Sequence, residues 1–97
     1  MKIYISGKVT GLPFDEVYKK FEQAEQEVIN LGGTPINPVK LVEQIEDATW
    51  EDYMEKDLAL LLRCQGIFLI KDWGDSKGAR CEYALSKELG LQIQFQK

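Results

Sequence analysis

A glutamate lies on the apolar face of a predicted helix near the end of the chain. The segment "DSKGARCEYALSKELG", residues 75–90, has helical periodicity, and its inward positions are Ala79, Glu82, Leu85 and Leu89. An ionised carboxylate that is buried without a partner destabilises a fold by several kcal/mol. Glu82 therefore either benefits from the positive N-terminal end of its helix and leans toward water, or lines a functional cleft.

A second acid shows the same anomaly in the helix predicted from about residue 50 to residue 63. Asp57 falls among the apolar positions of that helix, which are Trp50, Tyr53, Met54 and Leu61. The alternative interpretation is that this face of the helix ends at a solvated or subunit-facing edge. Two carboxylates that flank one bond suit cleavage at an anomeric carbon, where one attacks and the other handles the proton of the leaving group.

The loop before the last helix supplies a third chemical element. Ser76, Lys77 and Gly78 precede the predicted helix N-terminus, where free backbone N–H groups can hold a phosphate or a hydroxyl. The simpler interpretation is that Ser76 is an ordinary N-cap. Trp73, in the same loop, either covers a nucleobase or anchors a helix or a subunit contact.

Composition limits the classes of function. A chain of 97 residues with 44% hydrophobic residues fits one domain, residues 1–97. The net charge is −4 with interspersed signs, so nucleic-acid polymers are not expected partners. The absence of histidine excludes imidazole catalysis and the usual histidine metal sites, and no metal or cofactor is predicted.

The two cysteines and the apolar runs indicate the expected location of the protein. Cys64 and Cys81 form no C-x-x-C motif, and we expect reduced, buried thiols and a cytoplasmic protein. No charged-then-apolar leader is seen, and the longest apolar runs, "LALLL" and "GIFLI", are too short to span a bilayer. No membrane association is expected.

Strands and helices alternate along the chain. The clearest period is a helix with apolar residues spaced 3, 4, 3, 4, 3, from Phe14 to Leu31, stopped by Gly32 and Gly33. The other predicted elements are strands at 2–6, 34–38, 66–70 and 91–95 and helices at 50–63 and 79–89, with 39–48 unassigned and 71–78 a loop. This order predicts a small three-layer α/β domain, Rossmann-like or flavodoxin-like, with a parallel sheet of about four strands. Sites in such folds lie at the carboxyl ends of the strands.

Three segments resemble the nucleoside 2-deoxyribosyltransferase superfamily, and most closely its short bacterial and phage branch. They are "YISG", "EKDLALLLRCQGIFLI" and "DSKGARCEYALSKELG". The resemblance implies that Glu82 is the nucleophile of a covalent deoxyribosyl intermediate. It also implies that Asp57 assists protonation of the nucleobase and that Tyr4 orients Glu82.

The resemblance also bears on the substrate. The residue six before the glutamate is an aspartate in the transferases and a serine in the deoxynucleoside 5′-monophosphate N-hydrolases, and here it is Ser76. Substrate-binding positions are expected at Ser76 and Gly78 and in the first loop, at Gly7, Lys8 and Val9. Thr10 stands where the hydrolases carry an arginine, which removes a bidentate phosphate donor.

The leading hypothesis is therefore an enzyme that cleaves or transfers the N-glycosidic bond of a deoxynucleoside or its 5′-monophosphate. A non-catalytic nucleotide-binding or sensor module, with a phage or defence role, is the alternative, and an interaction domain is the third. The resemblance further implies a homodimer or a higher homo-oligomer that takes a small nucleoside or nucleotide.

Overall fold

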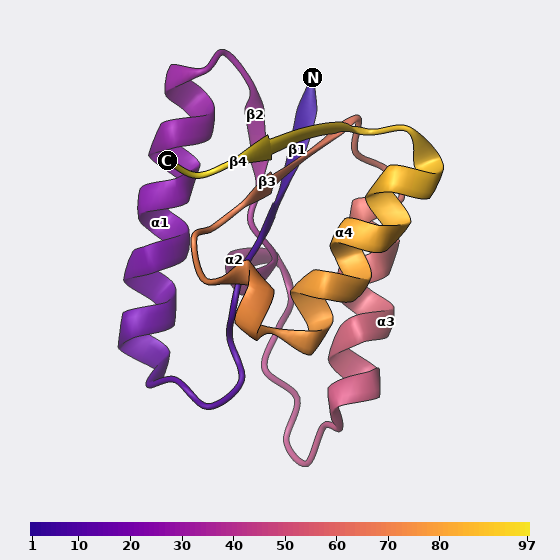
Figure 1. Cartoon of the computed structure of the whole chain (residues 1–97). Helices are drawn as coiled ribbons and strands as arrows, with labels where there is room; N and C mark the ends of the chain where they lie inside the picture. The colour runs from indigo at the N-terminus through magenta and orange to yellow at the C-terminus, as the bar shows by residue number, and fades with distance from the viewer.

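Four parallel strands form the centre of the molecule (Figure 1). In the computed structural model, which describes residues 1–97, they are β1 (Lys2–Ser6), β2 (Thr34–Ile36), β3 (Gly66–Leu69) and β4 (Gln92–Phe95). Their order in the sheet is β2-β1-β3-β4, and every neighbouring pair is parallel. The predicted α/β domain with a four-strand parallel sheet is confirmed.

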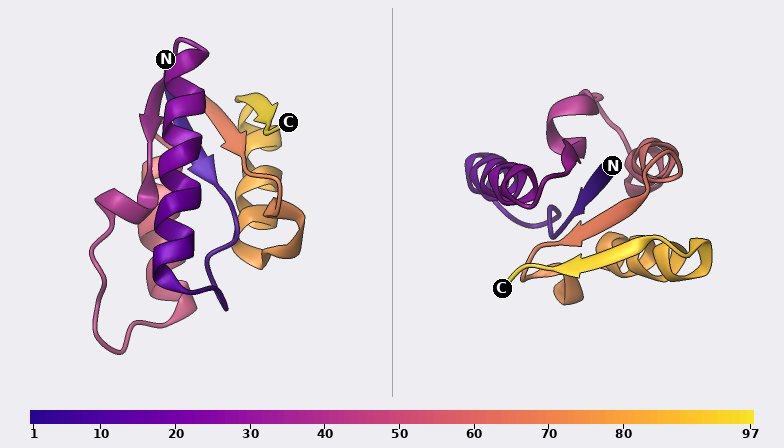
Figure 2. Two further views of the ribbon diagram at one scale, coloured as in Figure 1. Left: turned by 90° about the vertical axis from the view of Figure 1, so that its left-hand side faces the viewer. Right: turned by 90° about the horizontal axis from the view of Figure 1, so that it is seen from above.

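Helices cover both faces of the sheet (Figures 1 and 2). One face packs on α1 (Phe14–Asn30), whose apolar side joins Ile3, Ile5 and Phe68 in one core cluster. The other face packs on α3 (Trp50–Leu61) and α4 (Lys77–Leu89). Tyr4 lies on this face, in a second core cluster with Leu61 and Ile67. Side chains alternate along β1, so Tyr4 and Ser6 face away from α1.

The first long helix follows its predicted pattern with two exceptions at its ends. Its buried residues are Val17, Phe21, Ala24 and Val28, as predicted. The outermost positions of the pattern, Phe14 and Leu31, are 55% and 58% exposed, because they lie at the helix ends, beyond the buried sheet face. The Gly32–Gly33 stop is confirmed, with Gly32 at a φ of +88° and Gly33 donating its N–H to the carbonyl of Val28.

The predicted cap fixes the start of α3. The Asp52 N–H donates to Thr49 Oγ1 at 3.2 Å, and the Thr49 N–H donates to Asp52 Oδ2 at 2.9 Å. This reciprocal pair is the capping box that the sequence predicts. The helix ends at Leu61, two residues before the predicted boundary.

The predicted apolar face of α4 needs correction. Its buried residues are Ala79, Glu82 and Ser86, whereas Leu85 is half-buried and Leu89 is 45% exposed. Ser86 is fully buried because its hydroxyl donates to the carbonyl of Glu82 at 2.8 Å, which satisfies the polar group. The helix also begins at residue 77, two residues earlier than predicted.

The connecting segments add two short helices. A single turn, α2 (Pro38–Leu41), lies in the stretch left unassigned and is capped by Asn37, while residues 42–48 have no regular structure. A 3₁₀ turn, η1 (Trp73–Asp75), lies within the predicted loop. Cys64 is buried as expected, but Cys81 is exposed, and neither forms a disulfide. None of the helices has both the length and the apolar character needed to cross a bilayer.

Candidate functional site

A cavity of about 430 Å³ opens beside the carboxyl ends of β1 and β2. Its wall is mainly apolar and comes from the β1–α1 loop, the start of α1, residues 38–48, α3 and the start of α4. Two acids, Asp57 and Glu82, are the charged residues of the wall, and lysine and arginine are absent from it. The cavity can therefore hold a mainly apolar group next to two carboxylates.

Glu82 is held from behind by two hydroxyl groups of β1. Tyr4 donates its phenolic O–H to Glu82 Oε2 at 2.7 Å, and Ser6 donates its hydroxyl to Glu82 Oε1 at 2.7 Å. Tyr4 and Ser6 are each 1% exposed, and Glu82 is 4% exposed. Because each carboxylate oxygen accepts a bond from a fixed donor, the carboxylate has one defined orientation at the cavity wall.

Burial controls the ionisation of this carboxylate. The pKa of Glu82 is raised to about 7, mainly because burial removes water from the carboxylate. The hydrogen bonds from Ser6 and Tyr4 lower this pKa, and the nearby charge of Asp57 adds a smaller rise. Burial likewise raises the pKa of the Tyr4 phenol well above its usual range, with Glu82 as the next cause. Tyr4 is therefore a hydroxyl donor throughout the physiological pH range.

Asp57 supplies the second acid of the cavity. It lies in the middle of α3, is half-buried, and has a pKa that burial raises to about 6. A carboxyl group with that pKa is present in both protonation states near neutral pH, so it can give a proton and take it back. The cavity thus joins two carboxyl groups whose pKa values are both raised by burial, one of them oriented by two hydroxyl donors.

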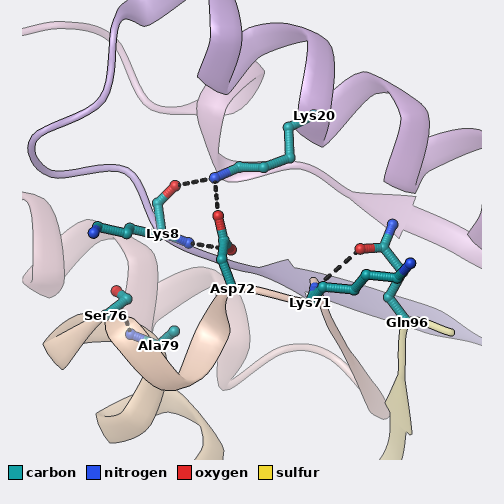
Figure 3. Close-up of polar contacts among 7 residues, drawn as sticks. All are labelled: Lys8, Lys20, Lys71, Asp72, Ser76, Ala79 and Gln96. Atoms are coloured by element: carbon teal, nitrogen blue, oxygen red, sulfur yellow. Dashed lines mark hydrogen bonds and ion pairs between the residues drawn. The ribbon is translucent and has the colours of Figure 1, made fainter.

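The N-terminus of α4 forms another part of the wall. Ser76 is the N-cap, and its Oγ accepts the Ala79 N–H at 3.2 Å (Figure 3). The same serine lines the cavity, so its hydroxyl hydrogen remains available for a ligand. A Cβ added at Gly78 would lie 3.1 Å from Met54 Sδ, so α3 and α4 approach closely here. Lys77 lies with its ammonium 4.4 Å from the centre of the Trp50 ring.

A polar network joins the two loops that carry these cavity residues (Figure 3). Asp72 accepts the Lys8 N–H at 3.1 Å with one carboxylate oxygen and pairs with Lys20 Nζ at 2.5 Å through the other. Lys20 Nζ also donates to the carbonyl of Lys8 at 2.6 Å. Both the backbone N–H and the carbonyl of Lys8 are therefore fixed, and the β1–α1 loop is held to the loop that follows β3.

The structure brings most of the predicted site residues together. The predicted residues that line the cavity are Gly7, Val9, Asp57, Ser76, Gly78 and Glu82. Tyr4 contacts Glu82 from the sheet side. Lys8 and Trp73 do not line the cavity. The peptide of Lys8 belongs to the loop network, and its side chain extends away from Asp72 (Figure 3). Catalytic and binding roles for the other residues stay predictions.

Trp73 lies outside the cavity wall, in an aromatic cluster, and its contact with a nucleobase stays a prediction. The Trp73 ring packs against Tyr83 and Phe95, with ring centres 4.7 and 5.8 Å apart. These partners belong to α4 and β4, at the edge of the sheet. Trp73 thus stabilises the packing of a helix on an edge strand, which is the other interpretation that its loop position allowed.

Sequence reasoning missed Ser6 and the wall formed by residues 38–48. Ser6 is two residues after Tyr4 on the same strand, and that spacing places both side chains on one face. A serine at the end of a strand that is otherwise apolar was the available signal. Pro38, Val39, Val42, Gln44 and Ala48 carried no such signal, because no periodic element positions the irregular stretch that contains most of them.

Comparison with known proteins gives the following relations. A 2-deoxyribosyltransferase from the psychrotolerant bacterium Bacillus psychrosaccharolyticus superposes with a TM-score of 0.73 at 24% sequence identity, covering 98% of this chain and 71% of that chain. This similarity shows a shared fold. Comparison with curated protein sequences gives no significant match. Residues 1–95 match the family described as Domain of unknown function (DUF4406), and the chain therefore belongs to that family.

Proposed function

We propose that this protein cleaves or transfers the N-glycosidic bond of a deoxynucleoside or a deoxynucleoside 5′-monophosphate, with Glu82 as nucleophile. The observation that carries the proposal is the Glu82 carboxylate, 4% exposed, fixed by two hydroxyl donors and placed in the wall of a cavity. A structural glutamate has no need of such an arrangement, since an apolar residue would fill the same position at lower cost. The fold shared with a 2-deoxyribosyltransferase supports the same conclusion.

In the first step, a carboxylate oxygen of Glu82 attacks the anomeric carbon of the sugar. The new C–O bond forms as the bond from that carbon to the base nitrogen breaks, and the electron pair of the broken bond goes to the nitrogen. Protonated Asp57 delivers its proton to the base, which leaves neutral, and Asp57 becomes a carboxylate. The product is an ester between Glu82 and the sugar.

In the second step, water or a second base attacks the same anomeric carbon from the face that the first base left. The ester C–O bond breaks, and its electron pair returns to Glu82 as a carboxylate. Asp57 accepts the proton of the incoming water or base and is ready for the next cycle. Two successive displacements retain the configuration at the anomeric carbon, and the nature of the acceptor decides between hydrolysis and transfer.

The rest of the cavity suits the remaining parts of a nucleoside. The apolar and aromatic wall near Asp57, which includes Trp50, Tyr53 and Met54, can cover the two faces of a base. The α4 N-terminus at Ser76 and Gly78 offers a hydroxyl and backbone amides to the far end of the sugar or to a 5′-phosphate. We assign the base to the α3 side of the cavity and the 5′ end to the α4 side.

The test is base release from a panel of deoxynucleosides and deoxynucleoside 5′-monophosphates, followed by chromatography with and without a second free base. We expect released base with at least one substrate, and loss of that release by several orders of magnitude in Glu82→Gln, because an amide cannot form the ester. The matched control is Glu88→Gln, which neutralises an exposed glutamate of the same helix. Release at the parental rate in Glu82→Gln would contradict the mechanism. Binding without release in the parent protein would favour a nucleotide-binding module.

A further inference from the structure

The Glu82 carboxylate has a donor on each oxygen, and the donor on Oε1 is Ser6. We propose that Ser6 is a positioning residue that holds the Glu82 carboxylate in the orientation and the ionised form that attack on the sugar requires. This inference rests on the function proposed above. It assigns a role in the reaction to a strand residue that the sequence motifs left without one.

The strand fixes the backbone that carries the Ser6 hydroxyl. Ser6 is the last residue of β1 and pairs with Leu69 of β3, and its carbonyl accepts the Ile70 N–H at 2.8 Å. Its side chain is 1% exposed, so solvent does not compete for the hydroxyl. The 2.7 Å separation from Glu82 Oε1 is typical of a short bond from a neutral hydroxyl to a charged oxygen. A fixed donor of this kind favours the ionised carboxylate over the neutral acid.

The groups that face Glu82 have opposing effects on its charge. Burial raises the pKa of Glu82, and Asp57, on α3, adds a smaller effect in the same direction. The hydroxyls of Ser6 and Tyr4, both on β1, lower that pKa, and the effect of Ser6 is the larger of the two. Removing the Ser6 hydroxyl should therefore leave Glu82 more often protonated at neutral pH, while the geometry of Tyr4 is retained.

The matched pair of variants is Ser6→Ala and Ser86→Ala. Both serines are buried, with exposures of 1% and 0%, and both donate their hydroxyl to an oxygen of Glu82. Ser6 donates to the carboxylate, whereas Ser86 donates to the backbone carbonyl at 2.8 Å. Each variant loses one buried hydroxyl, so a purely structural effect would be similar in both.

The first measurement needs no substrate. The ionisation of Glu82 is followed by ¹³C NMR of protein labelled at the glutamate side-chain carboxyls, with the Glu82 signal assigned by its absence in Glu82→Gln. We expect the midpoint of Glu82 to rise by about one to two pH units in Ser6→Ala, since a hydrogen bond to a charged group is lost. In Ser86→Ala the midpoint should stay within a few tenths of the parental value. If Ser6→Ala does not fold, Ser6→Cys replaces it and should shift the midpoint in the same direction, because a thiol is a weaker donor.

The second measurement uses any substrate that the parent protein turns over. The rate of Ser6→Ala relative to the parent should rise about eightfold from pH 6 to pH 9, for a midpoint shift of about one unit. It should stay below parity at pH 9, because the variant also loses the bond that orients the carboxylate. The ionisation of Asp57 cancels in this ratio, so the ratio reports Glu82 alone. The corresponding ratio for Ser86→Ala should not change with pH.

The outcomes separate this inference from the proposed function. An unchanged Glu82 midpoint in Ser6→Ala, or a pH-independent rate ratio, would overturn the role of Ser6 whether or not the protein is an enzyme. A raised midpoint in a protein that releases no base from any substrate would contradict the proposed function and would reduce the role of Ser6 to setting the charge of Glu82. A raised midpoint together with the pH-dependent rate ratio supports both.

Discussion

Replacing Glu82 with glutamine should stabilise the protein at alkaline pH, although it removes two charge-assisted hydrogen bonds. The pKa of Glu82 is raised by burial from its ordinary value of 4.5 to about 7. Folding therefore favours the protonated form. The stability that protonation provides is fully present below about pH 4.5 and is lost as the pH rises through about 7.

The size of this effect follows from the two pKa values. Between pH 5 and pH 8, a carboxyl with these values costs the folded state about 2.5 kcal/mol, since one pKa unit corresponds to about 1.4 kcal/mol. Glutamine is neutral at both pH values and carries no such cost. The free energy of unfolding of Glu82→Gln, relative to the parent, should thus increase by about 2–3 kcal/mol from pH 5 to pH 8.

The assay is urea unfolding followed by tryptophan fluorescence at pH 5, 6, 7 and 8, for the parent, Glu82→Gln and the exposed-residue control Glu88→Gln. The difference between Glu82→Gln and the parent should grow with pH, whereas the difference for the control should be flat. A constant difference for Glu82→Gln across this range would refute the reasoning, because it would mean that Glu82 has the same pKa in the folded and unfolded states.

Three further predictions concern pH, phosphate and assembly. Base release should peak between about pH 6 and 7, because the rate needs ionised Glu82 and protonated Asp57; a rate that is flat from pH 5 to 9 would contradict these roles. Deoxynucleoside 5′-monophosphates should bind more tightly than nucleosides in calorimetry. Ser76→Asp, which keeps a good N-cap, should reverse that preference by like-charge repulsion; equal binding of both ligands by the parent would exclude a phosphate subsite at α4. The protein should be a homodimer or larger by light scattering, and a stable monomer at working concentration would contradict this.

Most of the fold was predictable because its elements repeat simple periods. The spacing from Val17 to Val28 specified the face of α1, and the alternation of short β-branched strands with helices specified the parallel sheet. The prediction of which residues of α4 are buried was wrong at two positions. In α4 the predicted apolar face included Leu89, which is exposed, while the buried face includes Ser86, whose hydroxyl is satisfied within its own helix. Periodicity cannot identify a buried serine of this kind.

The site was predictable where a residue contradicted its own pattern. Glu82 and Asp57 each interrupt an apolar helix face, and both line the same cavity. Trp73 lies in a predicted loop, where a tryptophan interrupts no pattern. Its position in the sequence therefore could not distinguish a ligand contact from the packing against Tyr83 that the structure has. Ser6 did not interrupt the pattern of its strand, and the role proposed for it depends on a partner 76 positions away in the chain. Such long-range pairs require the fold.

The face of β1 that packs against α4 shows how this fold accommodates a reactive group. Tyr4 and Ser6 occupy positions where two apolar side chains would pack against α4 at no electrostatic cost, and Glu82 occupies a third. If these residues served stability alone, the hydroxyls and the acid could be exchanged together for apolar groups with little loss or a gain in stability. The three polar residues instead satisfy one another while leaving the carboxylate at the cavity wall. Their combined replacement, Tyr4→Phe with Ser6→Ala and Glu82→Leu, should therefore yield a protein at least as stable as the parent at pH 8 and devoid of base release. A large loss of stability in this triple variant would show that the arrangement is structural rather than functional.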